Sequence, residues 1–270
     1  MGLDGRIKER LKGKTVLITG GGSGIGRAAA LLLAKDGVNL AIVDLREDSV
    51  GSVVNEIERD GAGERTMGLV LDVRSADDMD EMVNAVVSRF GCIDVLVHSA
   101  GILRARKCGP KTLVQLTDRE WDEVVETNLR GAFLCNRAVA SEMIRQRKGC
   151  IINISSVLGL SGRVFDSAYC ASRFGIVGMS EALAEEVREY GVKVQVVMAE
   201  AVAASLWDQN GPIRAPAGSL QPERVAGLIR FVVAQPDNAV FGGVVIAPFS
   251  PAKARVRANR DTSGRKSMGA

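Results

Sequence analysis

Three glycines, Gly20, Gly24 and Gly26, lie between an apolar run and a helical pattern in the stretch TVLITGGGSGIG. Glycine lets a backbone turn tightly and approach a ligand closely, and the first amides of the following helix attract an anion. The chemistry that suits this arrangement is the binding of a diphosphate. A purely structural turn is the alternative, and the residues that follow weigh against it.

An acidic residue further along the chain narrows the choice of ligand. Asp44 closes the next apolar run, at an offset of 20 from Gly24. A carboxylate at that offset can accept both hydroxyl groups of an adenosine ribose. It also repels a 2′-phosphate, so the sequence favours NAD, with NADP the less favoured cofactor. Arg46, two positions on, is able to soften that preference.

The strands and helices that must position these residues are predicted from a regular alternation of apolar runs with segments of helical spacing. Apolar runs predict strands at 15–19, 40–44, 69–72, 93–98, 150–155, 193–198 and 243–246. Helical spacing predicts helices at 26–35, 49–59, 76–90, 118–147, 166–190 and 222–233. Such alternation is typical of an α/β protein with a doubly wound parallel sheet, the three-layer Rossmann fold. No repeat or linker divides the chain, so we expect a single domain over residues 1–250.

Charge patterning sets the end of the chain apart. The net charge is +3, yet the last twenty residues hold six cationic side chains against Asp261 alone. We expect residues 251–270 to form a basic, flexible tail, which can either contact phosphates or an anionic membrane or remain solvated.

Composition argues against several other classes of protein. Aromatic residues are only 4% of the chain, too few for nucleic-acid stacking platforms. His98 is the only histidine, which disfavours histidine-rich metal sites, and the five cysteines lack close-paired spacing. No signal peptide or membrane-spanning run is apparent. We therefore expect a cytoplasmic protein with a small-molecule substrate and without a metal, nucleic-acid or membrane partner.

Several further motifs, taken together, resemble the short-chain dehydrogenase/reductase family over about residues 11–247. Thr19 and the three glycines match its cofactor motif, and Asp72-Val73 resembles its adenine-contacting pair. The stretch His98-Ser99-Ala100-Gly101 stands where members usually have Asn-Asn-Ala-Gly, and Asn128, Ser156 and Tyr169 fall in the catalytic order of the family.

The resemblance implies hydride transfer between a nicotinamide and an alcohol or carbonyl carbon. The implied catalytic residues are Tyr169 as acid or base, Ser156 as hydrogen-bond donor to the substrate, Asn128 in a water relay, and Arg173. The implied cofactor-binding residues are Gly20, Ser23, Gly24, Ile25, Gly26, Asp44, Leu45, Asp72, Val73, Ser99, Ala100, Gly101, Tyr169, Arg173 and Val202. Relatives use the two long helices to form homo-dimers and homo-tetramers.

The sequence departs from the family near the nicotinamide. Arg173 stands four residues after Tyr169, where members have a lysine that holds the nicotinamide ribose. The arginine shares a helix face with Tyr169 and keeps the positive charge that favours a phenolate, but it is planar and bulky. After the strand at 193–198 the usual Pro-Gly and threonine are missing, and Glu200 places a carboxylate there. His98 can supply an asparagine's hydrogen bonds, and we expect a structural role for it.

Side chains around the expected substrate site suggest its chemistry. Six of these side chains are apolar: Leu158, Leu160, Phe165, Leu206, Trp207 and Ile213. They either form an apolar substrate pocket or simply pack the loop onto the core. Arg104, Arg106 and Lys107 are able to bind an acidic group, but a solvated face is the simpler explanation.

Three hypotheses about function remain open on the sequence. The first is an NAD-dependent oxidoreductase that interconverts an alcohol and a ketone. The second is a non-redox enzyme on the same fold, such as a dehydratase, isomerase or cyclase. The third is a binding or scaffold protein that retains nucleotide affinity but has lost or weakened catalysis.

Overall fold

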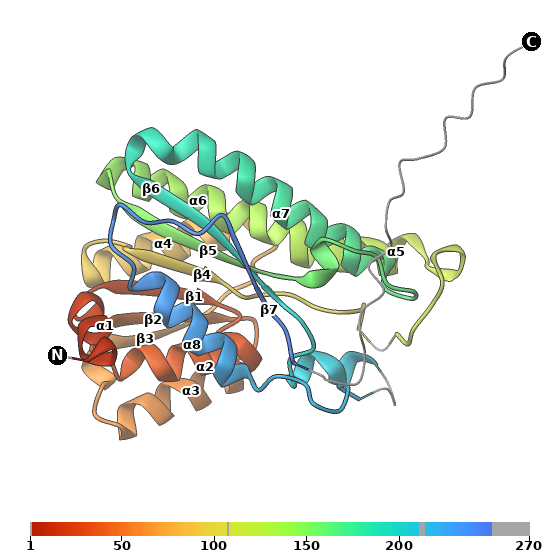
Figure 1. The fold of residues 1–270 in the computed structure, drawn as a ribbon, viewed down its shortest axis with the longest axis horizontal. Helices are drawn as coiled ribbons and strands as arrows, with labels where there is room; N and C mark the ends of the chain where they lie inside the picture. The colour runs from red at the N-terminus through yellow and green to blue at the C-terminus, as the bar shows by residue number, and fades with distance from the viewer. Residues whose placement is uncertain (1, 107, 211–213, 250–270) are drawn as a thin grey trace, which may run out of the picture.

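The computed structural model describes residues 2–106, 108–210 and 214–249, and it shows one parallel sheet between two layers of helices (Figure 1). The strands are β1 (Thr15–Thr19), β2 (Asn39–Asp44), β3 (Thr66–Val70), β4 (Val95–His98), β5 (Gly149–Ser156), β6 (Val192–Ala199) and β7 (Gly243–Ile246). They lie in the order β3-β2-β1-β4-β5-β6-β7. This is the predicted Rossmann fold, in a single domain. The predicted tail at 251–270 lies outside the described residues.

Helices cover both faces of the sheet because each strand alternates its apolar side chains between them. The helices are α1 (Leu3–Leu11), α2 (Gly24–Ala34), α3 (Glu47–Arg59), α4 (Ala76–Phe90), α5 (Asp118–Val125), α6 (Gly131–Gln146), α7 (Ser167–Val187) and α8 (Pro222–Val233). Val16 and Ile18 of β1 pack with α2 and α8, whereas Leu17 packs with α4 and α6. Figure 1 shows these two helical layers on opposite sides of the sheet.

The chain reverses its direction across the sheet between β1 and β4. Thr19 and His98 end these two neighbouring strands and face each other in the ladder. In an open parallel sheet a ligand binds in the crevice beyond the carboxyl ends of the strands at such a reversal. The fold therefore places the glycine turn after β1 and the segment after β4 at one site.

Several predicted bounds shift by one to three residues, and the clearest differences from the sequence prediction are the third strand and a first helix that was missed. The third strand spans Thr66–Val70 rather than 69–72, because Leu40↔Thr66 begins its ladder with β2. It is a half-exposed edge strand with a glycine inside it, so its apolar pattern is weak, and Asp72 lies in the turn that follows. Helix α1 was not predicted, since only Ile7 and Leu11 in it are buried.

The long helix predicted at 118–147 contains a local change of winding. Helix α5 continues through a π-helical turn at Glu126–Arg130 into α6, and this turn contains Asn128. Such turns often occur at functional sites because they redirect one side chain out of the regular helical pattern. Among the described residues, no helix has the length and apolar character needed to span a membrane.

Candidate active site

A cavity of about 1160 Å³ opens at the carboxyl ends of the strands. Of the residues predicted to bind cofactor or act in catalysis, only Gly26 and Asn128 do not line it. The predicted residues that line it are Gly20, Ser23, Gly24, Ile25, Asp44, Leu45, Asp72, Val73, Ser99, Ala100, Gly101, Ser156, Tyr169, Arg173 and Val202. The fold thus gathers segments from six turns along the chain into one site.

The glycine turn between β1 and α2 is built for close approach. Gly20 and Gly24 have φ angles of 64° and 50°, in the region that favours glycine. A Cβ atom on Gly26 would lie 2.2 Å from the carbonyl oxygen of Gly20. Gly26 therefore acts behind the cavity, by letting helix α2 start directly against the turn. The first amides of α2 face the cavity beside Ser23 and Gly24, and these residues fit the diphosphate of a dinucleotide.

Asp44 lies at the end of β2, facing the glycine turn. Its Oδ2 accepts the backbone N–H of Gly22 at 3.0 Å, and its Oδ1 accepts that of Arg46 at 3.2 Å. The carboxylate side chain is only 11% exposed, whereas that of Arg46 is 63% exposed and its Nε lies 4.0 Å from Oδ1. The cavity wall at this point therefore presents a fixed negative charge.

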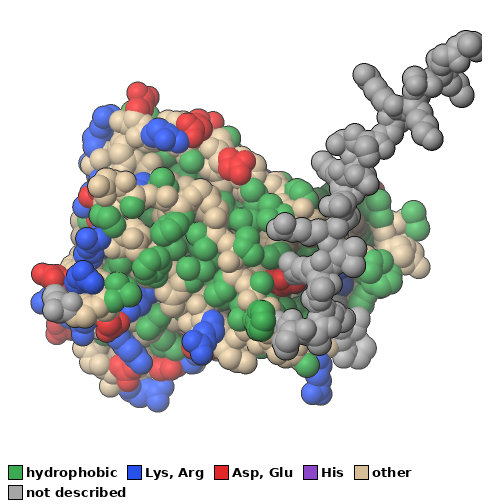
Figure 2. Space-filling view, viewed as in Figure 1, with side chains coloured by type: hydrophobic (Ala, Val, Ile, Leu, Met, Phe, Trp, Pro, Cys, Tyr) green, Lys and Arg blue, Asp and Glu red, His purple; other side chains and the backbone are tan. Residues whose placement is uncertain are grey.

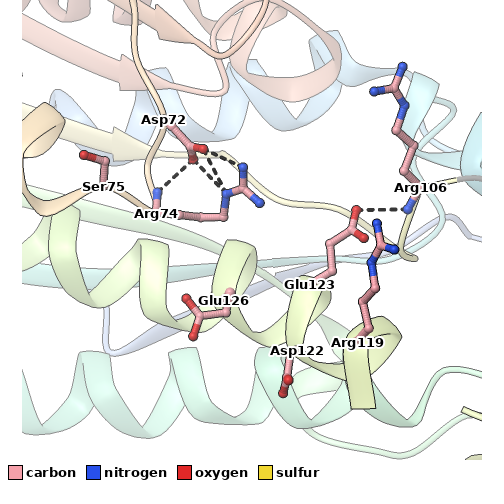
Figure 3. A pocket seen from close by; sticks show the side chains of 8 residues that line it. All are labelled: Asp72, Arg74, Ser75, Arg106, Arg119, Asp122, Glu123 and Glu126. Atoms are coloured by element: carbon pink, nitrogen blue, oxygen red, sulfur yellow. Dashed lines mark hydrogen bonds and ion pairs between the residues drawn. The ribbon is translucent and has the colours of Figure 1, made fainter. Parts of the chain in front are cut away.

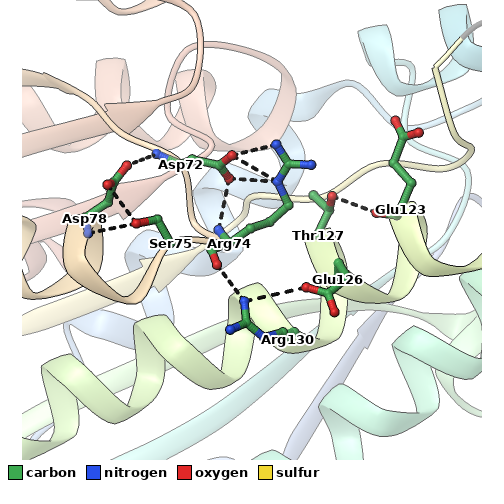
Figure 4. A network of polar contacts seen from close by, with 8 residues as sticks. All are labelled: Asp72, Arg74, Ser75, Asp78, Glu123, Glu126, Thr127 and Arg130. Carbon is green, nitrogen blue, oxygen red and sulfur yellow. Dashed lines mark hydrogen bonds and ion pairs between the residues drawn. The ribbon is translucent and has the colours of Figure 1, made fainter. Parts of the chain in front are cut away.

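The side chain of Asp72 is held by an arginine that the sequence analysis did not single out. Nε of Arg74 donates to Asp72 Oδ1 and Oδ2 at 3.0 and 2.9 Å, and Nη2 donates to Oδ2 at 2.6 Å (Figure 4). These bonds hold the pKa of Asp72 below its usual value. The backbone is fixed as well, since Asp72 N–H donates to Asp78 and the Arg74 carbonyl accepts from Arg130.

A second, smaller cleft of about 810 Å³ adjoins this network (Figure 3). Its walls carry mixed charge and share four residues with the main cavity: Asp72, Arg74, Arg106 and Glu123. The backbone N–H of Arg106 donates to Glu123 at 3.0 Å, which joins the segment after β4 to helix α5. The cleft extends the main cavity on the side of Asp72.

The three predicted catalytic residues that line the cavity come from β5 and α7. Ser156 ends β5, and its Oγ accepts the backbone N–H of Leu158 at 3.2 Å. Tyr169 lies in the first turn of α7 and is 7% exposed. The guanidinium of Arg173, one turn later, lies over the Tyr169 ring at 4.8 Å from its centroid, and its Nη1 donates to the carbonyl of Ile154 at 3.0 Å.

Asn128 lies behind this set. In the π turn its amide accepts the backbone N–H of Ile102 at 2.7 Å and donates to the Ile102 carbonyl at 2.8 Å. It also donates to Ser172 Oγ at 3.0 Å. The amide therefore ties the segment after β4 to α7, and the two hydrogen bonds to Ile102 explain why the helix is rewound there.

His98 is fully buried at the end of β4. Its Nδ1 lies 2.8 Å from Thr19 Oγ1. Burial and the nearby positive charge of Arg173 lower the pKa of His98 to about 3. The ring is therefore neutral near pH 7, in keeping with the structural role expected from the sequence.

The loop after β6 is held by backbone bonds in place of the Pro-Gly turn. Ala201 has a left-handed φ of 46°, and Val202 forms a parallel bridge with Leu220. The indole N–H of Trp207 donates to the Val202 carbonyl at 2.9 Å, and Gln209 accepts the backbone N–H of Leu103 at 2.8 Å. The bond to Gln209 ties this loop to the segment after β4, and Glu200 lies in the cavity wall.

The proposed apolar pocket is partly present. Leu158, Leu206 and Trp207 line the cavity, together with Leu103. Leu160 and Phe165 lie outside that lining and are 56% and 43% exposed. Ile213 and Lys107 lie outside the described residues.

The interpretation of Arg104 as part of a solvated face is wrong. Its side chain is 9% exposed, and Nη2 donates to Asp166 at 2.6 Å. Asp166, at the start of α7, is itself 2% exposed and also pairs with Arg163, whose guanidinium lies 5.5 Å from the Trp207 ring centroid. The buried carboxylate therefore joins the segment after β4 to the start of α7, and Arg163 extends this contact to the loop after β6. No local pattern in the sequence indicates this pair, because its members are 62 residues apart.

Substituting asparagine for Asp166 is expected to lower the free energy of unfolding by about 3 kcal/mol, because it leaves the buried Arg104 guanidinium without its counter-charge. Denaturant unfolding measures this loss. The matched control is Glu185→Gln, which removes a carboxylate from the exposed pair with Arg188 and is expected to cost less than about 0.5 kcal/mol. Equal losses in the two variants would contradict a stabilising role for Asp166.

Comparison with known proteins agrees with this geometry. Residues 14–212 match the family model described as short chain dehydrogenase. The 3-oxoacyl-(acyl-carrier-protein) reductase FabG of Thermotoga maritima is 35% identical over 244 residues, covering 87% of this chain and 96% of that protein.

Solved structures give the same result. A 3-ketoacyl-(acyl-carrier-protein) reductase from Brucella melitensis, complexed with NADH, superposes with a TM-score of 0.78 at 26% identity, covering 88% of this chain and 98% of that one. Levodione reductase superposes with a TM-score of 0.78 at 28% identity, covering 87% and 96%.

Fold and cavity define a dinucleotide-binding oxidoreductase. The chain belongs to the short-chain dehydrogenase/reductase family. It is an NAD(P)-dependent dehydrogenase/reductase that interconverts an alcohol and a ketone. Of the three hypotheses from the sequence, the first is thus supported at the level of reaction class.

Proposed function

We propose that this enzyme uses NAD(H) to interconvert an apolar alcohol and its ketone. The observation that carries the choice of cofactor is the Asp44 carboxylate. It faces the glycine turn and is fixed by two backbone N–H groups. At this position it accepts the ribose hydroxyl groups and repels a 2′-phosphate. Arg46 is largely solvent-exposed, so its charge compensates that of Asp44 only weakly.

The proposed catalytic roles follow from what lines the cavity. When bound, the nicotinamide supplies or accepts the hydride. Tyr169 gives a proton to the substrate oxygen or takes one from it, and Ser156 donates a hydrogen bond to that oxygen. Arg173 places a positive charge against the Tyr169 ring, at 4.8 Å from its centroid. Asn128 holds the backbone of Ile102 and Ser172 of α7 in register behind these groups.

The proposed substrate is an apolar carbonyl compound or alcohol. Leu103, Leu158, Leu206 and Trp207 supply an apolar wall on the side of Tyr169. The relatives named above are reductases of carbonyl groups, which supports the same chemistry. The test is a panel of apolar ketones and alcohols with NADH and NAD. Turnover of several members supports the proposal, and product formation without net change in the nicotinamide would contradict it.

Replacing Asp44 with alanine is expected to raise the Kd of NADH about tenfold and to lower that of NADPH, because two ribose hydrogen bonds and the repulsion of a 2′-phosphate are lost together. Fluorescence titration with each cofactor measures both constants. Asp48→Ala is the matched control, since Asp48 is exposed on α3 outside the cavity and carries the same charge. A wild-type enzyme that prefers NADPH would contradict the proposal.

We also propose a homo-dimer or homo-tetramer. Phe133 of α6 and Phe174 of α7 are 46% and 47% exposed. Figure 2 shows further apolar side chains across the middle of the face that carries α8 and β7, where Phe231 and Val245 are 36% and 50% exposed. Contiguous exposed apolar surface is typical of protein interfaces. Sedimentation velocity tests this, and a monomer at micromolar concentration would contradict it.

A further inference from the structure

Three buried side-chain atoms lack a hydrogen-bond partner among the described residues: His98 Nε2, Ser167 Oγ and Arg173 Nε. A buried polar atom without a partner costs free energy, so each one in a folded protein calls for an explanation. One of them, Arg173, lies against the ring of the proposed catalytic tyrosine. His98 is fully buried and Arg173 is 6% exposed.

The guanidinium of Arg173 lies at the end of the ladder between β4 and β5. The last pair of that ladder is His98↔Asn153, and Nη1 of Arg173 donates to the carbonyl of Ile154, the next residue. On its other side the group is close to Gly101, because a Cβ atom there would lie 2.6 Å from Nη2. The guanidinium is therefore enclosed by the two segments that continue from β4 and β5.

The ring of His98 lies on the same face of the sheet. Its register partner Asn153 bonds to Asn136 of α6 and Ser180 of α7, so the side chains of this row point toward the layer that holds Arg173. Thr19 occupies Nδ1 of the ring, which leaves Nε2 for a neighbour. Burial and the positive charge of Arg173 both favour the neutral form of the ring, because they lower the pKa of His98.

We propose that one buried water molecule joins Nε2 of His98 to Nε of Arg173, and that His98 is thereby a positioning residue for the guanidinium beneath Tyr169. Water suits this position because it both donates and accepts, so it pairs with the Arg173 N–H and with either tautomer of a neutral histidine. The guanidinium is then fixed at Nη1 by Ile154 and at Nε by the water. The effect on catalysis rests on the proposed function; the water site does not.

A high-resolution crystal structure of the full chain tests the site directly. Electron density for a water within hydrogen-bond distance of both nitrogens supports the proposal. Direct contact between the two side chains, or a dry space between them, overturns it. Because this measurement needs no turnover, it stands even if the enzyme reduces no ketone.

Two variants test the positioning role. His98→Gln keeps an amide near the place of Nε2, whereas His98→Asn keeps one near Nδ1 and withdraws from Arg173. We expect His98→Gln to keep kcat within about threefold and His98→Asn to lower it about tenfold, equivalent to about 1.4 kcal/mol, with little change in the Kd of NADH.

A spectroscopic readout separates positioning from simple loss of stability. In wild type and His98→Gln, the Arg173 Nε–H signal in NMR spectra should exchange slowly with solvent, and in His98→Asn it should exchange faster. Equal exchange rates and equal kcat in the two variants would overturn the positioning role, whatever their melting temperatures.

Discussion

Replacing Tyr169 with phenylalanine is expected to lower kcat about 10³-fold and to leave the Kd of NADH within about threefold. The substitution removes only the hydroxyl group, which is the proposed proton donor and acceptor, and general acid–base catalysis contributes about 10²–10⁴-fold. The aromatic ring remains, so the contact of Arg173 with its face at 4.8 Å is kept. Steady-state kinetics with a ketone substrate and a separate NADH titration measure the two quantities.

The other tyrosine of the chain offers a matched control. Tyr190 also has an arginine over its ring, Arg147 at 5.2 Å, but it lies beyond the far end of α7 and outside the cavity. The Tyr190→Phe variant is expected to keep the wild-type kcat. Normal turnover by Tyr169→Phe would remove that residue from the acid–base role, whereas loss of NADH binding along with kcat would indicate a structural fault instead.

The elements that could be predicted from sequence are those whose signal is local. The strand at 15–19 is buried along its whole length, and the glycine turn follows it at once, so both are visible in a short stretch. The parallel topology then brings together the ends of distant strands, and for this reason a few motifs located part of the cavity wall at the end of each of six strands. Helix α8 and strand β7 begin and end at the predicted residues, with Pro222 marking the helix start.

Features that depend on distant contacts could not be predicted. The π turn at Asn128 exists because its amide bonds to Ile102, 26 residues away, and no spacing rule within the helix records that contact. The ion pair of Arg104 with Asp166 was missed for the same reason. Likewise, the sequence marks His98 and Arg173 only as two separate departures from the family pattern, while the fold brings their unpartnered nitrogens into one buried layer.

Gly26→Ala is expected to destabilise the protein by about 4 kcal/mol or more and to raise the Kd of NADH over about 100-fold. The added Cβ would lie 2.2 Å from the Gly20 carbonyl oxygen and 3.1 Å from Gly21 Cα. Both are backbone atoms, so no side chain can rotate away, and the turn itself must open. Gly20 cannot yield easily, because it packs against Ala100 on its other side.

The control for this substitution is a glycine with the opposite surroundings. Gly51 lies inside α3, and a Cβ there would meet nothing within 4 Å. Gly51→Ala is therefore expected to stabilise the protein by about 0.5–1 kcal/mol through helix propensity, without affecting NADH binding. Thermal unfolding and NADH titration of both variants check the pair. Wild-type melting and normal NADH binding by Gly26→Ala would mean that the diphosphate binds elsewhere than at this turn. That result would contradict the cofactor-binding roles proposed for Gly20, Ser23 and Gly24.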